Sequence, residues 1–226
     1  MTQQEEGGGA RETPLRLFID TSDVKEVRRA TESGVVGGVA MNPGKVAEAG
    51  RPVAEIVAEI REFFAGPISI QGTEQETDAI VKEAIQLSGI SRNLCIKVPV
   101  TEAGIKAIGR LVPRGVKTNA TLVFSAGQAL LAGLAGSPFI SPFIGRTTDV
   151  GGSGIELIET IRAVYERYDI STQIIAASVK NVSQVVDAVL AGAHMIALPP
   201  KVFPDMCTHP QTIQGIDDFL CAAGKK

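Results

Sequence analysis

The sequence predicts an α/β protein that forms a single (β/α)8 TIM barrel. Three observations support this prediction: short apolar runs alternate with longer amphipathic segments, the alternation repeats eight times, and no linker-like stretch interrupts it. This alternation is typical of parallel strands that are joined by helices. The length of 226 residues also fits one barrel domain better than two separate domains.

Eight short apolar runs are predicted as strands, because they combine branched or aromatic residues with the usual length of a strand. The first run, LRLFID, closes on a polar residue, Asp20. In chain order the predicted strands are Leu15–Asp20, Val35–Ala40, Pro67–Gln71, Asn93–Val98, Val116–Asn119, Pro138–Pro142, Gln173–Ala177 and Met195–Leu198.

The segments between the strands are predicted as helices, because their apolar residues recur at helical spacing. Ser22 is expected to cap the first helix, which carries Val24 and Val27 on one face. The helix after the fifth strand is rich in Ala and Leu, so we expect it to be buried. After the first helix, the predicted helices are Pro52–Phe64, Glu74–Leu87, Thr101–Leu111, Ser125–Ala132, Gly154–Tyr168, Ser183–Ala191, Val202–Thr208 and Gln211–Ala222.

An open, doubly wound sheet is the alternative architecture. Such sheets often carry a Gly-rich phosphate turn after the first strand, whereas this chain reads IDTSD there, which favours the barrel. Residues 1–14 are polar and Gly-rich, so they are expected to form a flexible tail. Residues 15–226 then form the barrel and its C-terminal helices.

Composition argues against several classes of protein. A net charge of −3 and a pI near 5.5 do not indicate nucleic acid or an anionic membrane as a partner. No apolar run approaches the ~20 residues of a membrane span. Residues 1–14 also lack the pattern of a signal peptide. We therefore expect a cytoplasmic protein.

The cysteines and histidines are few and scattered. Cys95, Cys207 and Cys221 form an odd set without close pairs, which argues against a disulfide framework or a zinc site. His194 and His209 are too few for a typical histidine metal site, so we expect structural roles for both. No metal is expected.

A barrel of this kind places its active site at the C-terminal ends of its strands. Candidate site residues are therefore the side chains that stand at or just beyond those ends. They are Asp20, Asn42, Gln71, Lys97, Asn119, Thr121, Ser141, Phe143, Arg146, Ser178 and Lys180.

Lys97 is the most informative of these residues, because it interrupts the apolar strand LCIKVPVT. Inside a barrel its pKa would fall, and a neutral amine can attack a carbonyl to form a Schiff base. The alternative is a lysine at a strand end that extends into water. Asp20 is the candidate for proton transfer, with a helix N-terminal aspartate as the alternative.

Arg146, Ser178 and Lys180 suit an oxyanion. The guanidinium supplies a fork of donors, and Ser178 is expected just before a helix, where backbone N–H groups favour anions. The alternative is ordinary surface charge together with a helix cap.

Several motifs, in order, resemble the short form of the transaldolase family, which includes the fructose-6-phosphate aldolases. The motifs are FIDTSD, IKVPVTEAGIKAI, KTNATLVFSAGQALLA, SPFIGR and IIAASVK, and the resemblance covers nearly everything from Leu17 onward. It implies Lys97 as the Schiff-base lysine, Asp20 as the general acid/base and Thr121 as the residue that places the catalytic water. It implies substrate contacts for Asn42, Asn119, Ser141, Arg146, Ser178 and Lys180.

The resemblance also separates two subgroups. Transaldolases carry Phe where Phe143 stands, whereas the aldolases carry Tyr; together with Asn119 and Ser141, Phe143 therefore favours a transaldolase. Transaldolases usually carry Glu where Gln71 stands, and Gln cannot take up a proton at neutral pH. The family commonly reads TTNPS where this chain reads AMNPG, so Met41 is expected to change the lining beside the substrate.

The resemblance implies the transfer of a dihydroxyacetone unit from a ketose phosphate to an aldehyde acceptor. The alternatives are a lyase of the fructose-6-phosphate aldolase type, a variant for 6-deoxy-6-sulfofructose, and a non-catalytic barrel that binds sugar phosphates. No metal or organic cofactor is implied. The resemblance also implies a homo-oligomer, a pentamer or decamer, with residues His209–Ala222 as a contact element.

Overall fold

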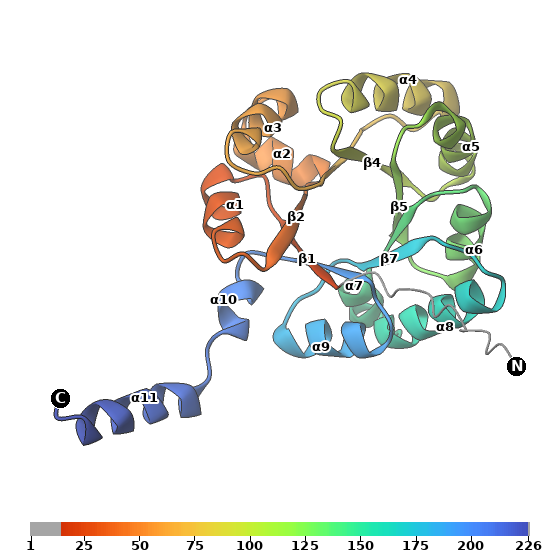
Figure 1. The fold of residues 1–226 in the computed structure, drawn as a ribbon. Coiled ribbons are helices and arrows are strands. Elements are labelled where there is room, and N and C mark those ends of the chain that lie inside the picture. The colour runs from red at the N-terminus through yellow and green to blue at the C-terminus, as the bar shows by residue number, and fades with distance from the viewer. Residues whose placement is uncertain (1–14, 226) are drawn as a thin grey trace, which may run out of the picture.

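The computed structural model describes residues 15–225 and confirms the (β/α)8 barrel. Eight parallel strands close into one barrel, in which β1 pairs with both β2 and β8, and helices cover the outside (Figure 1). The predicted tail, residues 1–14, lies outside the described residues. The strands are β1 (Arg16–Asp20), β2 (Val36–Ala40), β3 (Ile68–Gln71), β4 (Leu94–Pro99), β5 (Thr118–Val123), β6 (Phe139–Pro142), β7 (Gln173–Ala176) and β8 (Met195–Leu198).

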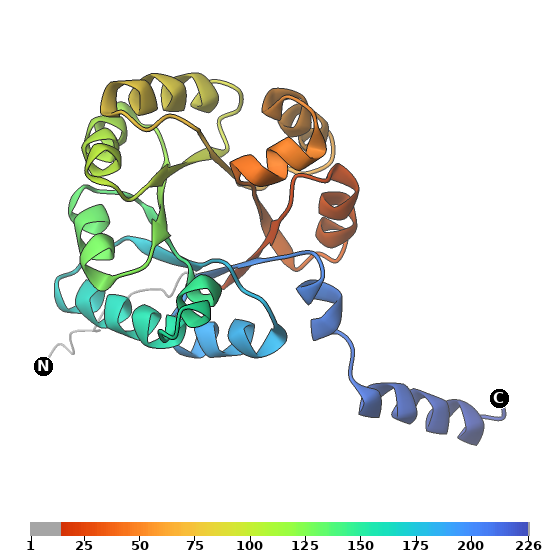
Figure 2. The same ribbon diagram turned by 180° about the vertical axis from the view of Figure 1, so that it is seen from behind.

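The helices alternate with the strands, and they surround the barrel on all sides when it is seen from behind (Figure 2). They are α1 (Val24–Thr31), α2 (Pro43–Ala49), α3 (Val53–Arg61), α4 (Thr77–Ser88), α5 (Glu102–Leu111), α6 (Ala126–Leu134), α7 (Ile144–Asp149), α8 (Gly154–Arg167), α9 (Val182–Leu190), α10 (Val202–Met206) and α11 (Pro210–Ala222). A short 3-10 helix spans Val112–Arg114 after α5.

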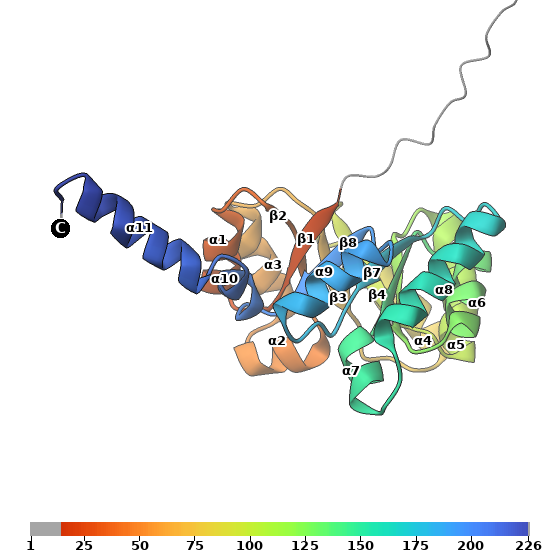
Figure 3. The same cartoon turned by 90° about the horizontal axis from the view of Figure 1, so that it is seen from below.

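Two short helices, α2 and α7, were not predicted. They contain seven and six residues, which is too few for a helical period to stand out in the sequence. Each begins directly after a strand, and Figure 3 shows both on the same end of the barrel. They therefore stand beside the C-terminal ends of the strands, where a barrel places its site.

Three local predictions are wrong. Asp23 rather than Ser22 caps α1, because Ser22 Oγ instead donates to the carbonyl of Lys45. The fifth strand runs on to Val123, since its pairing with β4 continues as far as Thr121 and Val123 pairs with Pro142 on β6. Helix α6 is not buried on all sides: its alanines face the barrel, while Leu131 and Leu134 are exposed.

Side chains alternate between the inside and the outside of the barrel, as they must in a strand. The inside holds a compact apolar cluster, which consists of Phe18, Ala40, Phe143, Ile175, Ala177, Met195 and Ala197. Gly38 on β2 is required there, because a Cβ atom at this position would overlap the ring of Phe18. The larger core cluster lies between the strands and the surrounding helices.

Helix α11 differs from the others, because it extends away from the barrel (Figures 1 and 3). None of its residues is buried, and Ile213, Ile216 and Phe219 are all more than half exposed. Within residues 15–225, no helix combines the length and the apolar character that are needed to cross a bilayer.

Candidate active site

A polar cavity of about 210 Å³ lies at the C-terminal ends of the strands, and we call it the active-site cavity. Eight of the eleven predicted site residues line it: Asp20, Asn42, Lys97, Asn119, Ser141, Phe143, Arg146 and Ser178. They come from six different strands or the segments directly after them, so only the closed barrel brings them together. Gln71, Thr121 and Lys180 do not line it.

Lys97 points into the cavity from β4, with Gln71 and Asn119 as its neighbours in register on the flanking strands. It is only 6% exposed, so it does not extend into water. Its Nζ donates a long hydrogen bond of 3.4 Å to the carbonyl of Met41. Burial lowers the pKa of Lys97, and the carboxylate of Asp20 partly opposes this shift.

Asp20 closes β1 and shares the cavity with Lys97. Its Oδ1 atom is buried and has no hydrogen-bond partner among the described residues, and the cap of α1 is Asp23 rather than Asp20. Burial raises the pKa of Asp20, while the charges of Lys97, Lys45 and Arg146 act in the opposite direction. The pair is thus a lysine with a lowered pKa beside an aspartate with a raised one, the combination expected for proton transfer near neutral pH.

A chain of hydrogen bonds orders the wall opposite Asp20. Ser141 Oγ donates to Asn119 Oδ1 at 2.9 Å, and Asn119 Nδ2 donates to Ser69 Oγ at 3.4 Å. All three side chains are buried. Because Asn119 has one partner on each side, its amide is held in one orientation towards the cavity.

The mouth of the cavity combines an aromatic ring with a cation. The guanidinium carbon of Arg146 lies 5.0 Å from the centroid of the Phe143 ring, within the range of a cation–π contact. Gly145, between them, allows α7 to pack against the segment after β7, because a Cβ atom there would overlap the carbonyl oxygen of Ser178. This packing holds Arg146 and Ser178 at the same cavity.

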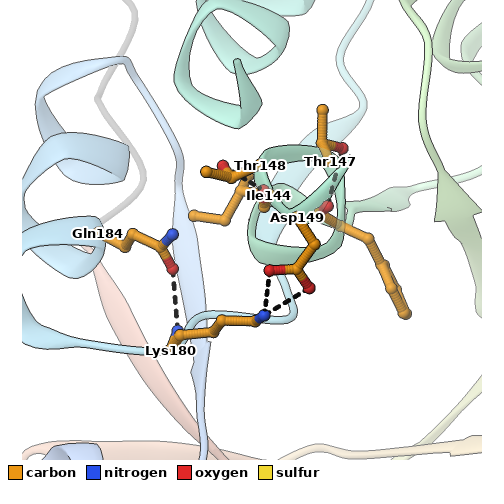
Figure 4. Close-up of polar contacts among 7 residues, drawn as sticks. Ile144, Thr147, Thr148, Asp149, Lys180 and Gln184 are labelled. Carbon is orange, nitrogen blue, oxygen red and sulfur yellow. Dashed lines mark hydrogen bonds and ion pairs between the residues drawn. The ribbon is translucent and has the colours of Figure 1, made fainter. Parts of the chain in front are cut away.

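Lys180 is directed elsewhere. Its ammonium group forms an ion pair with Asp149 at the end of α7, as Figure 4 shows. Its backbone N–H donates to Gln184 Oε1 at 2.9 Å. The expectation that Ser178 stands just before a helix is also wrong: α9 begins at Val182, and Asn181 caps it through its side chain.

Gln71 and Thr121 lie near the cavity without lining it. Gln71 ends β3 and lines a separate groove together with Pro43 of α2 and Glu83 of α4. Thr121 follows Asn119 by two residues on β5, and its Oγ1 atom is buried without a hydrogen-bond partner among the described residues.

The structure adds Lys45 and Ser69 to the lining of the cavity. Strand periodicity could have indicated Ser69, which precedes Gln71 by two positions, but Lys45 lies on the unpredicted helix α2. Asn42 fixes the start of that helix, because its Oδ1 accepts from the N–H of Lys45 at 3.1 Å.

The expectation for Met41 is wrong. Its side chain is fully buried in the larger core cluster, between the strands and the helices, and Ala40 faces the cavity instead. The reason is the alternation of the strand: Ala40 and Asn42 point inward, and the residue between them points outward.

The histidines have structural contacts. His194 Nδ1 accepts from the N–H of Ile174 at 3.0 Å, and His209 caps α11. Across residues 15–225, no cluster of three or more His, Cys, Asp or Glu side chains is arranged to hold a metal ion. Cys95, Cys207 and Cys221 are free thiols.

The closed barrel brings a buried lysine and a carboxylate together in one cavity at the C-terminal ends of its strands. This is the architecture of a barrel enzyme. Comparison with known proteins defines it further. Residues 17–224 match the family described as transaldolase/fructose-6-phosphate aldolase, and the chain belongs to that family.

Curated relatives agree with this assignment. A "Probable transaldolase" of Desulforamulus reducens is 46% identical over 206 residues, which cover 91% of this chain and 95% of the relative. Proteins with the same description from Brucella melitensis and Carboxydothermus hydrogenoformans are 45% and 44% identical, and the matches cover 95% and 96% of those proteins and 91% of this chain.

A solved structure described as "Native KDPGal structure" aligns with a TM-score of 0.59 at 15% identity. The alignment covers 88% of this chain and 85% of that chain. At this identity the likeness concerns the fold alone.

Proposed function

We propose that the protein is a transaldolase that moves a dihydroxyacetone unit from an anionic ketose to an aldehyde acceptor through a Schiff base on Lys97. The observation that supports this most directly is the buried amine of Lys97 in the same cavity as Asp20. Burial favours the neutral amine, which is the nucleophilic form.

The reaction begins when the amine attacks the ketose carbonyl and water leaves. The resulting protonated imine accepts electrons from the adjacent carbon–carbon bond as that bond breaks. Asp20, whose raised pKa suits proton exchange, takes the proton from the substrate hydroxyl as the aldehyde product departs. The three-carbon unit stays on Lys97 until an acceptor aldehyde captures it, and water then releases the product.

The remaining cavity residues suit the substrate. Asn42, Asn119 and Ser141 offer amide and hydroxyl groups to the hydroxyls of the sugar. Arg146 and Ser178 stand at the mouth, where a terminal anion of the ketose would lie. Lys45 adds a second positive charge to the same cavity.

The terminal anion is a phosphate or another 6-position anion, such as the sulfonate of 6-deoxy-6-sulfofructose. A sulfonate carries one charge, whereas a phosphate carries nearly two. Lys180, proposed from the family pattern as a further anion contact, pairs with Asp149 and would have to leave that pair to reach the substrate.

Two further residues complete the proposal. Thr121 would place the catalytic water, and its buried Oγ1 atom has the capacity to bond one. Gln71 cannot act as a base, so Asp20 carries out the proton transfers that it would share with a glutamate at position 71.

A lyase that releases free dihydroxyacetone is the second candidate. Phe143 argues against it, because the phenyl ring that lines the cavity has no hydroxyl to donate a proton. An acceptor aldehyde distinguishes the two activities, since a transaldolase requires it for turnover and a lyase does not. A non-catalytic barrel that binds sugar phosphates is the third candidate, because Gln71 and the AMNPG segment stand where the family commonly has other residues. The residues that the cavity keeps argue against it: Lys97, Asp20, Asn42 and Arg146.

Borohydride reduction tests the Schiff base. We expect a ketose donor with borohydride to add the mass of the reduced adduct to the peptide that contains Lys97, and Lys97→Ala to abolish both the adduct and turnover while the fold survives. Lys82→Ala, a surface lysine on α4, is the matched control and should keep both. Adduct formation in Lys97→Ala, or none in the wild type with any donor, would reject the mechanism.

The wider setting is also a proposal. We place the protein in the cytoplasm, with one barrel domain from residue 15 onward and without a cofactor. We further propose a homo-oligomer, a pentamer or decamer, in which α11 supplies a contact. The exposed Ile213, Ile216 and Phe219 support that role for α11.

A further inference from the structure

A second cavity lies at the opposite end of the barrel, and we call it the lower cavity. Its volume is about 510 Å³, within the usual range for a small-molecule site. It is lined by the N-terminal halves of the strands, from Arg16 on β1 to Met195 on β8. None of the predicted site residues lines it.

The charged side chains that line the lower cavity are all positive among the described residues. Arg16 and Lys117 both line it, and no carboxylate does so among the described residues. Neither side chain forms an ion pair with the part of the chain that the structure describes. The thiol of Cys95 adds no negative charge, because burial raises its pKa to about 12.

The body of the lower cavity is apolar. Phe139 and Met195 form part of its wall, together with Pro67 and Pro138. Arg16 and Lys117 are exposed, so their charged groups meet solvent as well as the cavity. A ligand that matches this arrangement places a hydrophobic body against the inner wall and an anionic group at the cations of the rim.

The lower cavity and the active-site cavity share one layer of side chains. Phe18, Ser69 and Ile175 line both of them. Ser69 is the polar member of this layer: it accepts from Asn119 Nδ2 on the active-site side, and it lies beside Cys95, its partner in register on β4, on the lower side. A molecule in the lower cavity therefore contacts a residue that orders the active site.

We propose that the lower cavity is a binding site for a small organic anion with an apolar body, separate from the active site and connected to it through Ser69. The anion is held by Arg16 and Lys117, and the body lies against Phe139 and Met195. The anionic group can be a carboxylate, a sulfonate or a phosphate, since the cations recognise the charge in each case.

Anilinonaphthalene sulfonate is a suitable probe, because it combines an aromatic body with one anionic group and fluoresces on binding. We expect saturable binding of one equivalent per chain. Arg16→Gln with Lys117→Gln should weaken binding about tenfold, since two exposed charge contacts are lost. Ala65→Trp, at the exposed rim of the cavity, should abolish it without disturbing the core.

Two controls separate this site from general adhesion. Lys82→Gln with Lys106→Gln removes the same charge from α4 and α5 and should leave binding unchanged. The uncharged probe phenylnaphthylamine should bind more weakly than the anionic probe, and equally well to wild type and to the Arg16/Lys117 variant. Anionic-probe binding that survives both Ala65→Trp and the double substitution would overturn the proposal.

The connection to the active site rests on the proposed function and has its own readout. The rate of borohydride trapping at Lys97 should change when the lower cavity is filled with anilinonaphthalene sulfonate, and should not change in Ala65→Trp. Absence of any trapping would reject the Schiff base but not the lower site. If the trapping rate stays the same when the probe is bound, the connection through Ser69 is overturned.

Discussion

Lys97 and Asp20 influence each other more than their positions in the sequence suggest. Burial alone lowers the pKa of the lysine and raises that of the aspartate, so it drives both groups towards their neutral forms. Each charge opposes the shift of the other, which leaves an amine and a carboxyl group that can both exchange protons. The charge of Arg146 lowers the pKa of both groups, so it opposes the effect of burial on Asp20 and adds to the effect of burial on Lys97.

This arrangement predicts opposite effects of two substitutions on Lys97. Asp20→Asn removes a charge that raises the pKa of Lys97, so the pKa should fall further below its ordinary value of 10.5. Arg146→Gln removes a charge that lowers it, so the pKa should rise. Only the neutral amine attacks a carbonyl, so the midpoint of trapping rate against pH reports this pKa. Midpoints that move in the same direction would contradict this reading.

Arg146 and Lys180 should differ in their effect on substrate binding. Arg146 lines the cavity, so Arg146→Ala should raise KM for an anionic ketose by about tenfold or more, and much less for a neutral ketose. Lys180 is held by Asp149, so Lys180→Ala should change KM less. Steady-state kinetics with a charged and an uncharged donor measure both effects, and equal losses on the two donors would count against an anion site.

At the scale of elements, strand alternation explains what the sequence could predict. Asp20 ends one apolar run and Lys97 interrupts another, both at positions that point inward. The strand pattern and the family motifs together therefore predicted most of the polar residues that line the cavity. The unpredicted parts depend on short helices and on contacts between distant segments. Lys45 enters the cavity through α2, and Lys180 meets Asp149 from 31 residues away, which no local pattern encodes.

Helix α5 offers a matched pair of glycines for a prediction about stability. Gly104 packs against the end of β4, and a Cβ atom there would overlap the carbonyl oxygen of Pro99, so Gly104→Ala should destabilise by about 1–3 kcal/mol. Gly109 in the same helix faces open space, so Gly109→Ala should stabilise by about 0.5–1 kcal/mol. Urea unfolding gives both values. A similar response at both positions would show that α5 does not pack closely on β4.

At the scale of the whole molecule, the barrel has two differently charged ends and one helix that leaves it. The active-site cavity balances Asp20 against its cations, whereas the lower cavity holds cations alone among the residues described. Helix α11 contributes no buried residue to the barrel, so its own apolar face remains uncovered in a single chain. Exposed apolar faces of this kind are typical of contacts between subunits.

The apolar face of α11 leads to a prediction about the proposed homo-oligomer. Replacing Ile213, Ile216 and Phe219 with Gln should convert the proposed oligomer into smaller species, because it removes the exposed apolar area that we propose to lie between subunits. The free energy of unfolding of the isolated barrel should change little, since none of these residues is buried in it. Sedimentation equilibrium measures the mass of the assembly.

The opposite face of the same helix supplies the control for this experiment. Gln211, Gln214 and Asp218 lie about half a turn away from the apolar residues, at positions spaced along one polar side. Their replacement with Ala should leave the mass unchanged, because polar residues on the outer side of a docked helix stay in water. If both triple variants keep the mass of the wild type, or if the wild type itself is monomeric, α11 does not join subunits, and its exposed face needs another explanation.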